Sequence, residues 1–369
     1  MPAEWEPHAA TWIAWPHNHD DWPGKFEPIP WAYAEIVRNL SRYERVEIIV
    51  SDAAGEKSAR KVLQRADALN DKVHFCCWPT DRVWTRDSGC TFVKNEVRAN
   101  QNESSQARPD SPFDSAQGRL GGLSPGGLIG VKWRFNAWAK YSDWRKDEKI
   151  GGLMAKAAGV NAVLAQFAGK RVVLEGGAID VNGRGTLLTT EECLLGKTQQ
   201  RNPKMKRSDY EEIFAQYLGV TKFIWLSSGI AGDDTHGHVD DITRFVTPDT
   251  VVSVIESDPR DANYEPLREN IRRLRAATDQ DGQELAIVEL PMPRPIIFDG
   301  RRLPASYANF YVANGIVLVP VFNDPNDRIA LDALADVFPD REVAGIYCGD
   351  LIWGFGAIHC MTQQQPAFY

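Results

Sequence analysis

The chain has 369 residues, of which 43% are hydrophobic and 25% are charged, a composition typical of a soluble globular protein. Its formal charge of −8 argues against a nucleic-acid partner, which requires a basic face, and is compatible with a cationic substrate. No apolar run approaches the ~18 residues of a membrane span, and the first residues lack the pattern of a secretory signal. The six cysteines show no CxxC pair or regular spacing, so we expect neither a disulfide framework nor structural zinc. This pattern fits a protein of the reducing cytoplasm.

Segments typical of strands and of helices alternate along the chain. The first helix is predicted near 33–40, where apolar residues recur at helical spacing, and the strand 46–50 follows it. A later helix has clear boundaries, because Ser208 and Glu211 match a capping box and Gly219 ends the pattern. Other helices are expected near 55–69, 145–158, 264–277 and 326–338, and other strands near 10–15, 73–78, 90–94, 172–190, 222–226, 242–255, 285–290, 309–321 and 343–348.

The segment 100–127 differs in composition from the rest of the chain. Asn, Gln, Ser, Pro, Asp and Gly dominate it, and apolar residues are almost absent before Leu120. Such a composition cannot bury a core, so we expect a flexible surface insertion between two strands. No other linker stands out, and we predict that 1–369 otherwise forms a single domain.

Two segments combine a carboxylate with a setting that suits a small-molecule site. Asp87 follows a predicted strand after a short turn, next to Arg86, and the two residues form either a structural ion pair or part of a site. Glu175 precedes two glycines, which permit a close approach of the backbone or a β-bulge with an exposed carboxylate. On these signals alone, both interpretations stay open.

A third segment, 232–241, is dense in histidine and aspartate. If the chain is extended here, His236, His238 and Asp240 share one face, because side chains alternate along a strand. Such a face is suited to binding a metal, or to acting as a general acid and base with carboxylate neighbours. A solvated polar turn is the third interpretation.

The fourth segment contains a cysteine in an unusual context. Free cysteines are most often buried and inert, as we expect for Cys76 and Cys77 in an apolar run. Cys360 differs, because a glycine-broken loop leads into it and polar residues follow it. This pattern predicts an exposed, polar setting in which a thiolate can react.

Together the four segments resemble the agmatine deiminase family, within the larger group of guanidino-modifying enzymes. The matching motifs cover nearly the whole chain and occur at 2–7, 12–16, 84–89, 133–138, 175–177, 187–195, 200–203, 237–240, 303–311 and 358–365. The resemblance implies an α/β fold, a five-bladed α/β-propeller or pentein, with pseudo-fivefold ββαβ repeats and an active site on the axis. The alternation of elements agrees with this fold, but it would equally suit a doubly wound sheet.

The resemblance also implies a mechanism for attack on a guanidinium group. Asp87 and Asp240 would bind the guanidinium nitrogens, and Cys360 would attack the central carbon as a thiolate. His238, oriented by Glu175, would protonate the departing ammonia and then activate water. No metal or organic cofactor is required.

The substrate implied by the resemblance is agmatine, which would be hydrolysed to N-carbamoylputrescine and ammonia on a route towards putrescine. Asp233 and Asp234 are the candidates for binding the distal amine, and Trp84 is the candidate for lining the pocket beside the aliphatic chain. We expect a small cationic guanidino partner, neither nucleic acid nor membrane, and a possible homo-oligomer.

The chain departs from the family pattern next to the cysteine. The family has Gly-Gly-Gly-Asn before Ile-His-Cys, whereas this chain has Phe355 and Ala357 at the second and fourth of these positions. Cys90 replaces a proline that is common in the family, and His236 stands where the family often has aspartate. These changes affect the pocket more than the reacting groups.

Three alternatives follow from the same residues. The chain could be a deiminase of peptidyl or free arginine, because the pocket is altered around Phe355. It could be a metal-dependent hydrolase that uses His236, His238 and Asp240. It could also be a non-catalytic guanidinium binder.

Overall fold

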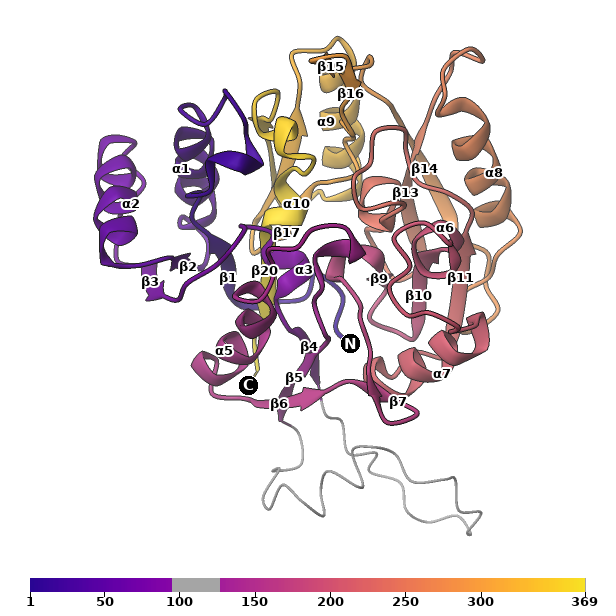
Figure 1. The fold of residues 1–369 in the computed structure, drawn as a ribbon. Coiled ribbons are helices and arrows are strands. Elements are labelled where there is room, and N and C mark those ends of the chain that lie inside the picture. Colours follow the sequence, from indigo (N-terminus) through magenta and orange to yellow (C-terminus); the bar gives the residue numbers. More distant parts are fainter. Residues whose placement is uncertain (95–126, 369) are drawn as a thin grey trace.

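The computed structural model describes residues 1–94 and 127–368, in which strands and helices alternate along the chain (Figure 1). The predicted α/β class is confirmed. The predicted insertion at 100–127 lies outside the described residues, except for Gly127. In the described part of the chain, no helix is both long enough and apolar enough to cross a bilayer.

Five sheets within the described residues repeat one pattern, in which an antiparallel pair of strands is followed by a parallel strand. One sheet carries an additional parallel strand, β3, on its edge. The sheets are β20 (Thr362–Pro366), β1 (His8–Ala14), β2 (Arg45–Val50) and β3 (Val73–Cys77); β4 (Thr91–Lys94), β5 (Leu128–Lys132) and β6 (Asn161–Leu164); β9 (Asp180–Val181), β10 (Thr186–Thr190) and β11 (Lys222–Leu226); β12 (Thr243–Phe245), β13 (Thr250–Ile255) and β14 (Ala286–Pro291); and β17 (Tyr311–Ala313), β18 (Ile316–Val321) and β19 (Glu342–Tyr347).

A helix connects the second and third strands of each repeat, so that the order within each unit is ββαβ, as expected. These helices are α1 (Ile29–Leu40), α5 (Ile150–Ala157), α7 (Arg207–Leu218), α8 (Tyr264–Arg275) and α9 (Asn326–Val337), and α2 (Ala53–Arg65) joins β2 to the additional strand. The apolar face of each helix is buried; in α8, for example, Leu267 and Leu274 are buried while Arg272 is exposed. In Figure 1, α2 and α8 lie at opposite sides of the molecule and α9 lies near the top.

The first strand of each repeat is preceded by a short turn, and these turns supply the polar residues of the site. They are α3 (Thr85–Ser88) before β4, η4 (Gly176–Ala178) before β9, η5 (Val239–Asp241) before β12, the irregular segment 304–310 before β17, and α10 (Ile358–Met361) before β20. Asp87, Glu175, Asp240, Asn309 and Cys360 therefore occupy corresponding places in five successive units. The repetition of the fold brings distant segments of sequence to one site.

Several predicted elements differ from the observed ones. The segments 172–190, 242–255 and 309–321 are each divided by a turn into two antiparallel strands, as at Gly315, where φ is +77°. Strands β5 and β6 were not predicted. The predicted capping box at Ser208 is wrong: α7 begins after Lys206, whose backbone N–H donates to the Asp209 carboxylate at 2.8 Å.

Candidate active site

A cavity of about 220 Å³ leads down to Cys360. Trp84, Trp138 and Trp353 contribute to its walls. That Trp84 lies beside the aliphatic chain of a substrate stays a prediction. Cys360 is only 4% exposed, and the predicted exposed setting is wrong. The glycine-broken loop packs tightly above the thiol instead, since a Cβ at Gly356 would lie 2.5 Å from the Trp84 ring.

The Cys360 sulfur lies between an amide and a carboxylate. Its Sγ accepts a hydrogen bond from Asn309 Nδ2 at 3.1 Å and lies 3.8 Å from Asp240 Oδ2. Burial, followed by the charges of Asp240, Asp241 and Asp87, raises the pKa of the thiol well above its usual value, against the effect of Asn309. These surroundings favour the neutral thiol over the thiolate.

The Asp87 carboxylate is directed at the site by two donors. Trp138 Nε1 donates to Oδ2 at 2.9 Å, and the Gly177 backbone N–H donates to Oδ1 at 3.1 Å. Arg86, its neighbour in sequence, instead pairs with Glu4 at 3.0 Å, so the interpretation of Arg86 and Asp87 as an ion pair is wrong. Burial raises the pKa of Asp87 to about 6, although the nearby imidazole lowers it.

His238 lies fully buried among three carboxylates. Its ring nitrogens are 3.7 Å from Glu175, 3.9 Å from Asp87 and 4.0 Å from Asp240. Burial alone would lower the pKa of His238, but Asp87, with Cys193 and Glu175, raises it well above its ordinary value. Neither ring nitrogen has a hydrogen-bond partner among the described residues; Nε2 faces Glu175, and Nδ1 faces Asp87 and Asp240.

Glu175 is held on the far side of His238 by a buried arginine. Arg201 Nε lies 3.2 and 3.3 Å from the two carboxylate oxygens, and both side chains are fully buried. Burial opposes ionisation, yet Arg201 and His238 lower the pKa of Glu175 below its usual value. Glu175 is thus a fixed negative charge beside the imidazole.

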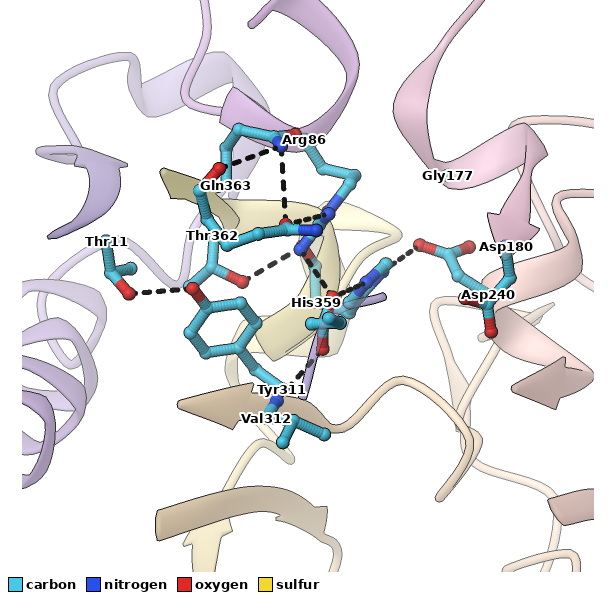
Figure 2. Close-up of polar contacts among 12 residues, drawn as sticks. Thr11, Arg86, Gly177, Asp180, Asp240, Tyr311, Val312, His359, Thr362 and Gln363 are labelled. Carbon is cyan, nitrogen blue, oxygen red and sulfur yellow. Dashed lines mark hydrogen bonds and ion pairs between the residues drawn. The ribbon is translucent and has the colours of Figure 1, made fainter. Parts of the chain in front are cut away.

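A chain of buried charges extends behind Asp240. His359 Nδ1 lies 2.6 Å from Asp240 Oδ2, and its Nε2 lies 2.8 Å from Glu4 Oε2 (Figure 2). Glu4 in turn pairs with Arg86 at 3.0 Å and with Arg244 at 2.9 Å. Although burial opposes it, His359 lowers the pKa of Asp240, so this carboxylate is ionised. Glu4, in the N-terminal motif 2–7, therefore helps to hold Asp240 in place through His359.

The three candidate metal ligands His236, His238 and Asp240 do not converge on one point among the described residues. The segment is not extended: His236 has a φ of +66°, and η5 begins directly after His238. His236 turns away towards Glu192, at 3.7 Å. The condition under which these side chains would share one face, an extended chain, is therefore not met.

Two other groups have ligand atoms within 4.8 Å of one another, Glu175 with Cys193 and His238, and Asp240 with Asp241 and Cys360. Glu175 already has a cationic partner in Arg201. The second group surrounds the sulfur of the same pocket, and it suits a guanidinium cation equally well.

The two aspartates predicted for the distal amine have different surroundings. Asp234 lines the pocket, where it pairs with Lys140 Nζ and accepts from Tyr141 Oη at 2.7 Å. Asp233 is not part of the lining; its carboxylate accepts from the backbone N–H groups of Gly237 at 2.6 Å and His238 at 3.2 Å. Asp233 shapes the loop that presents the histidine.

Of the two altered residues before Cys360, only Phe355 lines the pocket. Phe355 forms part of its lining with a left-handed backbone, φ +65°, which costs a non-glycine residue on the order of 1–2 kcal/mol. Ala357 is buried, with 1% of its surface exposed. The family glycine at the position of Phe355 is thus replaced where glycine is favoured.

Comparison with known proteins places the chain in a family. The chain matches the Porphyromonas-type peptidyl-arginine deiminase family over residues 1–366. It is 35% identical to the agmatine deiminase of Pseudomonas fluorescens over 390 residues, covering 100% of this chain and 95% of that protein. These matches and the five ββαβ units define the class, a pentein-fold enzyme. The chain belongs to the Porphyromonas-type peptidyl-arginine deiminase family.

Solved structures agree with this assignment. The agmatine deiminase of Enterococcus faecalis superposes with a TM-score of 0.82 at 28% identity, covering 99% of this chain and 95% of that one. A Cys→Ser variant of the C. jejuni agmatine deiminase, solved with its substrate bound, gives a TM-score of 0.81 at 26% identity, covering 100% and 96% of the two chains.

Proposed function

We propose that this protein is a cysteine-dependent guanidine deiminase that hydrolyses agmatine to N-carbamoylputrescine and ammonia. The observation that carries the proposal is the arrangement around Cys360, where Asp87 and Asp240 lie near the thiol and His238 has no hydrogen-bond partner among the described residues. This arrangement suits a planar cation, because two carboxylates can hold its nitrogens while the sulfur faces its carbon. The names of the full-length relatives support agmatine as the substrate.

Binding of the substrate prepares the nucleophile. The pKa of Cys360 is high because it is buried among carboxylates. A guanidinium bound to Asp87 and Asp240 neutralises these charges and places a positive charge beside the sulfur, which lowers the pKa of the thiol. Cys360 therefore becomes a thiolate when the substrate is in place, and its proton passes to solvent water.

The reaction then proceeds in two halves. The Cys360 thiolate attacks the guanidinium carbon, and His238 as an imidazolium protonates the departing nitrogen, so that the C–N bond breaks and ammonia leaves. The result is an amidino-thioether on the sulfur. The neutral imidazole next takes a proton from water, and the hydroxide attacks the same carbon. The C–S bond then breaks, and the hydroxyl proton passes to the departing sulfur, which gives the carbamoyl product and restores the Cys360 thiol. Glu175 stabilises the imidazolium in both halves.

The rest of the pocket suits a long cationic substrate. The rings of Trp84 and Trp138 provide apolar walls for the methylene chain. Asp234 lines the same cavity, and its carboxylate adds to the negative potential that attracts the distal amine. Arginine in a peptide is the alternative substrate, and the description of the family supports it.

We further propose that the enzyme acts in the cytoplasm, without nucleic acid. The six cysteines are free, and the proposed mechanism requires a reduced thiol. A homo-oligomer stays a prediction.

Ammonia release from agmatine and from an arginine-containing peptide tests this function. We expect agmatine to be converted to the carbamoyl product at the higher kcat/KM, and chelators to have no effect. Faster turnover of the peptide would contradict the proposed substrate. Loss of activity on chelation would contradict the thiol mechanism.

A further inference from the structure

Most charged side chains of the pocket lining already have partners. Arg82 donates to Asp21 at 2.5 Å and to Asp143 at 3.1 Å, and Asp234 pairs with Lys140. Arg82 is shared by two carboxylates, so these pairs leave a small net negative charge, which attracts a cation but does not distinguish one cationic guanidine from another. Selective recognition of a charged substrate has to come from the remaining groups.

Among the described residues, two charged side chains of the lining have no ion-pair partner. Asp20 and Arg301 are both exposed, and in the described ranges neither side chain forms an ion pair or a side-chain hydrogen bond. Asp87 and Cys360, the buried members of the same lining, are 5% and 4% exposed. The exposed pair therefore lies at the open end of the cavity, and the reacting groups lie at its foot.

Arg301 is held over the pocket by aromatic rings. It belongs to the hairpin of β15 (Ile297–Phe298) and β16 (Arg301–Arg302), at the top of Figure 1. Its guanidinium carbon is 5.6 Å from the centroid of the Trp353 ring and 6.0 Å from that of Phe355. Phe298 packs on the same tryptophan with a centroid distance of 4.3 Å, which ties the hairpin to the pocket wall.

These contacts give a reason for Phe355. The residue occupies a left-handed conformation that favours glycine, so its side chain has to offset that cost. Phe355 supplies one of the two rings beneath Arg301, and a glycine at this position would lack that ring. Phe355, which departs from the family pattern, thus supports the Arg301 cation at the mouth of the pocket.

We propose that Arg301 and Asp20 form a subsite for the charged end of the substrate, in which Arg301 binds a carboxylate and Asp20 binds an ammonium group. The subsite rests on the proposed function, because it assumes a guanidinium at Cys360. A free α-amino acid offers both charges at the end opposite the guanidinium, whereas agmatine offers only the ammonium. Arginine within a peptide chain offers neither. The pocket accordingly accepts free arginine besides agmatine, and prefers both to internal arginine in peptides.

The test is the ratio of kcat/KM for arginine to that for agmatine, measured in the wild type, R301Q, R301K and D20N. In R301Q we expect kcat/KM for arginine to fall about tenfold, because a hydrogen bond to a charged group is lost at an exposed site. The value for agmatine should rise, because a positive charge near its ammonium is removed. R301K should retain part of the preference, and D20N should lower both values. The effects should appear in KM, since the subsite lies away from the reacting carbon.

R294Q is the matched control. Arg294 is exposed, precedes the same hairpin, pairs with Asp324 at 2.9 Å and does not line the pocket, so its removal should leave the ratio unchanged. An equal change for both substrates in R301Q, or turnover of agmatine with none of arginine, would overturn the subsite. Calorimetric binding of arginine and agmatine to C360A and to C360A/R301Q separates the two proposals. Absence of turnover with a charge-dependent preference in binding would refute the reaction and leave the subsite standing.

Discussion

The foot and the mouth of the pocket are built on opposite principles. At the foot, Asp87 and Glu175 are each fixed by buried donors, and each of the reacting groups comes from a corresponding turn of a repeating unit. At the mouth, Asp20 and Arg301 are exposed and have no ion-pair partner among the described residues. The comparison indicates that the buried repeats determine the chemistry, whereas a few surface residues determine which guanidine enters.

The largest effect is expected at the foot, from C360A. Removing the sulfur should lower kcat by about 10⁴-fold or more, because no other nucleophile can take its place. C348A is the control: Cys348 is also buried and near the C-terminus but does not line the cavity, so kcat should change little. Activity that survives in C360A would contradict the assignment of the nucleophile to the foot of the pocket.

The charges behind the foot should dominate stability. E4Q leaves Arg86 and Arg244 with less compensation in a buried site, and should lower the free energy of unfolding by about 3 kcal/mol in urea denaturation. E6Q, the control, removes a carboxylate whose pair with Lys94 is about one-third exposed, and should cost less than about 1 kcal/mol. Equal losses of unfolding free energy in E4Q and E6Q would show that the buried charges around Glu4 stabilise the fold no more than a partly exposed pair does.

Asn309, at the foot of the pocket, affects the ionisation of the Cys360 thiol. Its amide lowers the pKa of Cys360 against burial and the carboxylates, so N309A should shift alkylation of the thiol to higher pH. Loss of this donor should also lower kcat by about 10²-fold. N314A removes a comparable half-buried amide that bonds to His8, and should leave the alkylation profile unchanged. An unshifted profile in N309A would contradict its role.

The pH dependence of kcat/KM reports on Asp87. Burial raises its pKa to about 6 in the free protein, and only the ionised form can hold a guanidinium. As pH falls through about 6, the carboxylate gains a proton, and kcat/KM should fall by about tenfold per unit below that value. A profile that stays level between about pH 5 and about pH 7 would contradict this assignment.

The smallest effect is expected at the mouth, from F355G. The change removes one ring beneath Arg301 and relieves a left-handed residue, so the arginine-to-agmatine ratio should fall by a factor of roughly two to five. Stability should change by less than about 1 kcal/mol, because relief of the backbone offsets the lost contacts. An unchanged ratio would show that the ring has no part in substrate choice.

The sequence predicts the foot better than the mouth. Each main site residue lies in a short polar segment beside glycines or at the end of a predicted strand, and such signals are local. The partners are not local: His359 meets Glu4 across 355 positions, and nothing near Glu4 marks it as buried. The hairpins within 172–190 and 242–255 were missed although Asn182-Gly183 and Pro248-Asp249 are typical turn residues between their strands.

The setting of the nucleophile was also beyond the sequence. Glycines and polar residues around Cys360 predicted an exposed thiol, but these glycines instead permit close packing against Trp22 and Trp84. Cys77, predicted to be buried, is exposed because its strand β3 lies at the edge of its sheet. A glycine in a sequence permits either flexibility or close packing, and in the structure Gly354 and Gly356 serve close packing.

Acid-quenched turnover of agmatine tests the central claim most directly. The protein is mixed with substrate, quenched within one turnover and digested, and the peptide that carries Cys360 is weighed by mass spectrometry. We expect a transient amidino adduct on this peptide that disappears as product accumulates, and none on the peptide with Cys193. Product formation without any modification of Cys360 at any time would contradict it.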